Sequence, residues 1–136
     1  MMIPMIAAYF AVLVVMVVVD LVWLGVIAKP LYQQGIGHLM AAKPMLPAAA
    51  VFYLIFPLGL LYFAIAPDGV VQGWTGVLIK GALFGFFAYA TYELTNLALL
   101  RNWPVNIVLI DIAWGAALSA MSAAAGKWAW DAMAGG

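Results

Sequence analysis

Three carboxylic acids lie inside long apolar stretches of this chain, where an unpaired charge is costly. Asp20 lies in VVVDLVWLG, Glu93 in YATYELTNLALL and Asp111 in VLIDIAWGA. Acids in such surroundings are protonated and hydrogen-bonded, share protons with one another, or bind a cation supplied from outside. Ionisable side chains within a membrane are, by default, candidates for a functional site. The elements that carry these three acids therefore have to be placed first.

The composition of the chain is typical of a membrane protein. Of its 136 residues, 69% are hydrophobic and 7% are charged, whereas soluble domains are about 25% charged. A helix of about 20 apolar residues crosses the hydrocarbon core. We therefore expect an all-α fold, a four-helix transmembrane bundle that forms a single integral membrane domain over residues 1–136. The expected spans are about 3–28, 46–66, 76–100 and 105–125.

The three acids are expected at a common depth. At a rise of 1.5 Å per residue, Asp20 lies about 12 Å before the end of its span and Glu93 about 10 Å before the end of its own. Asp111 lies about 9 Å inside the last span, which enters from the same side. Convergence on one intramembrane polar site is the economical interpretation. Its expected members are Asp20, Glu93, Asp111, Trp23, Tyr89, Tyr92, Asn96 and Trp114.

Small residues accompany the acids on the same helical faces. Gly81 and Gly85 share a face with Glu93 at helical spacing, and Gly115 and Ser119 share one with Asp111. Small residues four apart let two membrane helices approach closely. We expect these four residues to serve helix packing, with the polar faces of the third and fourth spans packed inward against the first span. In the second span, Pro57 and Gly59 predict a kink, and Tyr53 is expected to serve packing.

Several kinds of chemistry are excluded or unsupported. The chain has no cysteine, which excludes disulfides, thiolate nucleophiles and Cys-ligated metals. It has no glycine-rich phosphate loop, no histidine pair and no Ser-His constellation. No cofactor is predicted and no catalytic residue is assigned, so a role other than enzyme is favoured. A magnesium or manganese site made of acids alone stays open, and the metal is unknown.

The charges indicate the partners and the orientation. The net charge is zero, so no basic surface points to nucleic acid, and the expected partners are the lipid bilayer and a homo-oligomer or larger membrane complex. Lys29, Lys43 and Arg101 fall in loops on one side of the membrane, against Lys80 and Lys127 on the other. Because cytoplasmic loops carry an excess of Lys and Arg, the termini are expected in the periplasm.

Three blocks of the sequence resemble a known family. DLVWLG in the first span, GALFGFFAYATYELTNLALLRNWP through the third and DIAWG in the fourth resemble small bacterial membrane proteins grouped as domain of unknown function 2177. The resemblance implies a four-span integral membrane protein and no activity. The expected location is the bacterial cytoplasmic membrane. The family pattern often has aspartate where this chain has Glu93, an exchange that keeps the charge and lengthens the reach.

Three functions stay open at this point. In the first, the acid layer binds a proton, a cation or a small polar solute for transport. In the second, the chain is an accessory or assembly subunit of a larger membrane complex, and the acids join helices. In the third, the chain is a membrane enzyme acting on a lipid or quinone, with a carboxyl group as general acid or base.

Overall fold

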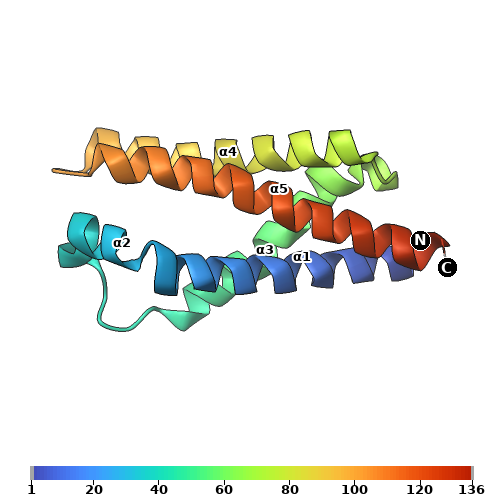
Figure 1. Ribbon diagram of the computed structural model, residues 1–136, viewed down its shortest axis with the longest axis horizontal. Coiled ribbons are helices and arrows are strands. Elements are labelled where there is room, and N and C mark those ends of the chain that lie inside the picture. Colours follow the sequence, from blue (N-terminus) through green and yellow to red (C-terminus); the bar gives the residue numbers. More distant parts are fainter. Residues whose placement is uncertain (1, 136) are drawn as a thin grey trace.

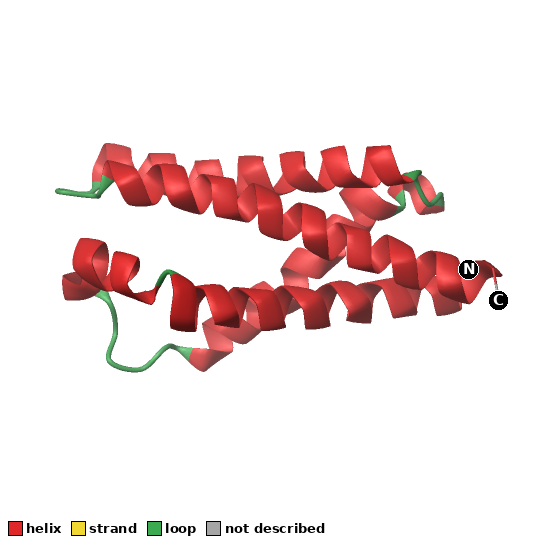
Figure 2. Ribbon diagram, in the orientation of Figure 1, coloured by secondary structure: helices red, strands yellow, loops and turns green. Residues whose placement is uncertain are grey.

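The structure, a computed structural model, describes residues 2–135 and is a bundle of four long helices (Figure 1). The helices are α1 (Met2–Val22, continued by a π-helical turn over Trp23–Ile27), α3 (Leu46–Leu60, continued by a π-helical turn over Leu61–Ile65), α4 (Trp74–Leu99) and α5 (Val105–Gly135). Each is long and apolar enough to cross a membrane. Residues 2–135 contain no strand (Figure 2). The expected all-α transmembrane bundle is thereby confirmed.

The last helix runs further than the span expected for it. α5 continues beyond Ala125 to Gly135. Lys127 is buried there, pairs with Asp131 one turn later at 2.9 Å, and lies 5.2 Å from the centre of the Trp74 ring. Trp130 is buried in the main core. These contacts stabilise the C-terminal part of α5. The apolar length of the sequence does not predict this extension.

A short helix, α2 (Lys29–Ile36), follows α1 at the end of the bundle opposite both termini (Figure 1). Pro30 stands in its first turn, where proline removes no hydrogen bond. Its Gly35 lies so close to α5 that an added Cβ would come within 2.2 Å of the Ile107 side chain. Ala28, Tyr32 and Ile107 form a small separate core. The connector is therefore folded back onto the bundle.

The helix α1 packs on the bundle through one narrow stripe. Its buried residues Ala8, Val12, Met16 and Asp20 recur every four positions, the spacing that keeps side chains on one helical face. The side chain of Val12 packs directly on Gly126 of α5. A Cβ added at Gly126 would lie 2.6 Å from Val12. The stripe ends at Asp20, so the packing of α1 carries this acid into the bundle.

The closest approach between two helices is that of α4 and α5. A Cβ added at Gly85 would lie 2.1 Å from the carbonyl oxygen of Gly115 and 2.3 Å from Oγ of Ser119. A Cβ at Gly81 would lie 2.9 Å from Cβ of Ala123. Glycine is therefore required at Gly85 for the backbones to touch. This contact sets the register that brings Glu93 of α4 and Asp111 of α5 to the same end.

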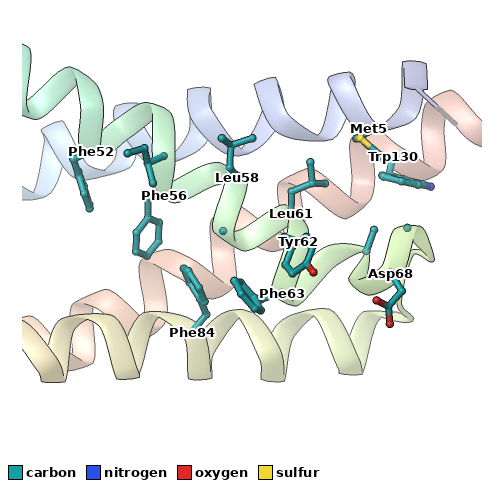
Figure 3. Close-up of a pocket in the computed structure, with 14 residues that line it drawn as sticks. Met5, Phe52, Phe56, Leu58, Leu61, Tyr62, Phe63, Asp68, Phe84 and Trp130 are labelled. Atoms are coloured by element: carbon teal, nitrogen blue, oxygen red, sulfur yellow. The ribbon is translucent and has the colours of Figure 1, made fainter.

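The helix α3 crosses the bundle obliquely (Figure 1). Pro57 lies inside it, and the helix widens to π-helical form directly afterwards, at Leu61–Ile65, as expected when proline interrupts the hydrogen-bond ladder. Beside α3 is an apolar groove of about 930 Å³. Figure 3 shows it edged by Phe56 and Phe63 of the α3 segment and Phe84 of α4. None of the three intramembrane acids lines this groove, whose wall is almost entirely apolar.

Candidate functional site

Asp20 joins three helices through its carboxyl group. Tyr53 of α3 donates a short hydrogen bond to Oδ2, and Nε1 of Trp114 on α5 donates to Oδ1 at 3.1 Å. Asp20 is 5% exposed, so both of its oxygens are accounted for by the protein. These two bonds join residues that are 33 and 94 positions apart in the sequence. Asp20 is thus bound on both oxygens by neutral donors.

Two stacked tryptophans connect Asp20 to Asp111. The rings of Trp23 and Trp114 lie 4.2 Å apart between centres and are inclined by 7°. Nε1 of Trp23 lies 3.5 Å from the Tyr32 hydroxyl, which donates to Oδ1 of Asp111 at 2.8 Å. Burial raises the pKa of the Tyr32 phenol, and the adjacent Asp111 raises it further. The phenol therefore stays protonated and donates at any physiological pH.

Glu93 is held from the turn between α4 and α5. Nε1 of Trp103 donates to its Oε1 at 2.8 Å, and Glu93 is 1% exposed. Trp103 is buried and follows Asn102, whose φ of +58° reverses the chain in the left-handed region that asparagine tolerates. The tight turn thus supplies a donor to Glu93 at the end of the bundle where Asp111 of α5 also lies.

Glu93 and Asp111 line one cavity of about 500 Å³, under α2 and between α1 and α4. Tyr32 and Tyr92 line the cavity with hydroxyl-bearing side chains, and Lys29 is the basic residue in its lining. The apolar part of the lining is Leu21, Leu24, Gly25, Ile36, Met40 and Pro44. Asp111 also lines a second cavity of about 370 Å³ on the side of α3, with Tyr89 and Tyr92.

The expected site residues divide between two places. Glu93 and Asp111 come together at the cavity, whereas Asp20 does not line it and is bonded to Tyr53 and Trp114. Within residues 2–135 no group of three or more acids or histidines is arranged to hold a metal ion. Trp23 and Trp114 lie between the two places. The cavity with the pair Glu93 and Asp111 is therefore the candidate site.

The remaining expected members lie around that pair. The Tyr89 ring packs on Gly115, where a Cβ would come within 2.2 Å of it. Tyr92 is 54% exposed and meets the Trp103 ring edge-on, with centres 6.3 Å apart. Asn96 is half-buried, one turn further along α4. Gly81, Gly85, Gly115 and Ser119 all lie in the contact of α4 with α5.

Three donors to the acids were not identified from the sequence: Tyr32, Tyr53 and Trp103. The sequence assigns Tyr53 to packing, and it predicts no role for Tyr32 and Trp103, which lie between the expected spans. A signal existed for Trp103, because a tryptophan in a short turn ten residues after a buried acid can reach back to it. Tyr32 and Tyr53 carried no local signal, since their partners lie on other helices.

The match to a family model decides the classification of this chain. Residues 5–128 match the model described as a predicted membrane protein, DUF2177. The chain belongs to the DUF2177 family. The comparisons with curated proteins and with solved structures gave no match. The family match covers both Glu93 and Asp111 of this DUF2177 protein, and all the donors that hold them.

Loss of the Tyr32 hydroxyl should loosen α2. Tyr32→Phe removes the donor to Asp111 and keeps the ring in its small core, so we expect a loss of about 1 kcal/mol in stability and faster proteolysis of the 29–45 connector. Both are measurable in detergent, by thermal unfolding and limited digestion. Tyr62→Phe is the control because Tyr62 is 63% exposed on the apolar groove. Equal digestion of the two variants would contradict a clamping role for Tyr32.

Proposed function

We propose that this membrane protein is a small carrier that binds a proton or a cation at the Glu93 and Asp111 pair. The supporting observation is the pair itself: two buried carboxyl groups, from two neighbouring helices, that line one cavity. Among residues 2–135 the one acid in an ion pair is Asp131, with Lys127. Two adjacent carboxylates in a medium of low dielectric constant repel each other strongly. The pair therefore calls for a shared proton or a bound cation.

Hydrogen bonding favours an exchangeable ion at this pair over a purely structural contact. The donors Trp103 and Tyr32 engage one oxygen of each acid, Oε1 of Glu93 and Oδ1 of Asp111. Neither Oε2 nor Oδ2 receives an N–H or O–H group from residues 2–135. An ion can therefore bind and leave at these oxygens while the protein's own bonds keep both side chains in place. Because one chain is small for a complete path, we propose that a homo-oligomer completes it.

The test is flux into liposomes that contain the purified protein and a trapped pH-sensitive dye. We expect the wild type to dissipate an imposed pH or cation gradient, and Glu93→Gln and Asp111→Asn to slow it about tenfold or more, as for loss of a charge-assisted contact. Both amides keep a carbonyl oxygen for the Trp103 or Tyr32 donor. Asp68→Asn, in an exposed turn at φ +56° that asparagine tolerates, should transport like the wild type.

Two results would contradict the carrier function. One is a wild-type flux no faster than that of empty liposomes for protons and for the common monovalent cations. The other is equal flux in the wild type, Glu93→Gln and Asp111→Asn. Thermal unfolding of each variant separates a lost site from a lost fold.

We further propose that the protein lies in the bacterial cytoplasmic membrane with the α2 end in the cytoplasm. Lys29, at the start of α2, and Lys43 and Arg101 all belong to segments that connect the long helices at that end, away from the termini, and such an excess favours the cytoplasmic side. Because the chain has no cysteine, single cysteines report topology cleanly. His38→Cys should react with an impermeant maleimide only after permeabilisation, and Met133→Cys in intact cells. The reverse pattern would overturn this orientation.

A further inference from the structure

The volume and lining of the cavity at Glu93 and Asp111 point to an organic ligand. A proton or a bare cation needs only the two acids, whereas the cavity measures about 500 Å³, within the range of small-molecule sites. Most of its wall is apolar, including Leu21 and Leu24 of α1, which are 59% and 44% exposed on the outside of the bundle. The cavity thus continues onto the face of α1 that lipid covers.

The cavity has acidic groups and one basic group in its lining, which suits a ligand that carries one positive and one negative charge. Glu93 is 1% and Asp111 8% exposed, and each has one carboxyl oxygen without a donor from residues 2–135. Those oxygens suit a primary ammonium group, which presents three N–H donors. Lys29, at the start of α2, lines the same cavity and is exposed. Its ammonium group suits a phosphate at the membrane boundary.

We propose that this cavity binds the head of an aminophospholipid-like amphiphile, with its ammonium at Glu93 and Asp111 and its phosphate at Lys29. This inference rests on the proposed function and names the cation that the pair takes. The acyl chains lie along Leu21 and Leu24, in contact with the bilayer. Tyr32, clamped to Asp111, holds α2 as the cover over the head group. The same chemistry could come from a membrane lipid or from a free amine, and these sources are separable.

Native mass spectrometry of the detergent-solubilised full chain tests the inference. The lipid probes are phosphatidylethanolamine, phosphatidylcholine and phosphatidylglycerol with identical acyl chains, and the soluble probes are phosphoethanolamine and octylamine. We expect phosphatidylethanolamine to bind about tenfold more tightly than the other two lipids, since choline has no N–H donor and glycerol has no positive charge. Binding of octylamine or phosphoethanolamine above that of the lipid would assign the site to free amines and overturn the lipid source.

Three variants locate the ligand. Glu93→Gln and Asp111→Asn should remove the preference for phosphatidylethanolamine. Lys29→Gln should weaken the binding of that lipid about threefold and leave the binding of octylamine unchanged, because octylamine lacks a phosphate. Asp68→Asn should bind like the wild type. Equal binding of all three lipids to the wild type, or a preference that survives in Glu93→Gln and Asp111→Asn, would overturn the inference.

The outcome is separable from that of the carrier function. Flux that depends on Glu93 together with equal binding of the three lipids overturns the ligand and keeps the carrier. A preference for phosphatidylethanolamine that depends on Glu93, with no flux above empty liposomes, supports the ligand and overturns the carrier. Thermal unfolding of every variant in the same detergent shows that the fold is retained.

Discussion

Replacing Gly85 by leucine is expected to abolish the folded bundle. An added Cβ would stand 2.1 Å from the carbonyl oxygen of Gly115 and 2.3 Å from Oγ of Ser119. The first of these atoms belongs to the backbone of α5 and cannot rotate away, so the two helices must separate. Overpacking of this kind costs about 3 kcal/mol or more, and the separation also displaces Glu93 from Asp111. We expect little monodisperse protein after purification and a large fall in unfolding temperature.

The matched control is Gly76→Leu on the same helix. A Cβ there would meet only Gln72, at 3.5 Å, an ordinary contact. Since leucine forms helix more readily than glycine, this variant should be as stable as the wild type. Gly85→Ala should fall between the two. Wild-type unfolding for Gly85→Leu would show that α4 and α5 do not meet as closely as described.

Replacing Asp20 by alanine is expected to produce the second largest loss of stability. Asp20 accepts hydrogen bonds from Tyr53 and from Nε1 of Trp114. Alanine leaves both donors without an acceptor inside the bundle, at about 1 to 3 kcal/mol for each. The total free energy of unfolding of a protein is about 5 to 15 kcal/mol, so the two lost acceptors remove a large fraction of it. Unfolding followed by tryptophan fluorescence measures it, because the Trp114 and Trp23 stack lies beside the acid.

The companion variant Asp20→Asn separates structure from transport. Its carbonyl oxygen still accepts from Trp114 or Tyr53, so it should lose less stability than Asp20→Ala. If Asp20 serves mainly to join α1, α3 and α5, Asp20→Asn keeps the flux that Glu93→Gln loses. Wild-type stability of Asp20→Ala would contradict the joining role. Loss of flux in Asp20→Asn with an intact fold would instead add Asp20 to the proposed carrier site.

Much of the fold could be predicted from the chain alone, because its cause is local. Apolar length makes a helix in a bilayer, where every backbone polar group must be satisfied within the segment. The π-helical widening of α3 after Pro57 also has a local cause, the hydrogen bond that proline removes. The extension of α5 could not be anticipated, because it depends on the contact of Lys127 with Trp74 across two helices and on the burial of Trp130.

The candidate site was predictable in its acids and not in its donors. Glu93 and Asp111 were expected together, since their depth and helical phase can be counted along each helix. Asp20 was expected with them; it lies outside the lining of their cavity and accepts from Trp114, an expected member of the site, and from Tyr53, which was not expected there. Depth places a residue along the membrane normal only. Its position within the membrane plane depends on the order and rotation of the helices.

By itself, the sequence determined that this is a membrane protein of four helices, with three acids in its apolar spans and small residues beside two of them. Each of these properties depends on residue type and spacing within one helix. The tertiary structure alone decided that Glu93 and Asp111 share a cavity under α2, and that Tyr32, Tyr53 and Trp103 hold the acids. The physical reason is that a hydrogen bond between segments requires a distance and an orientation, and these exist only after the helices have packed.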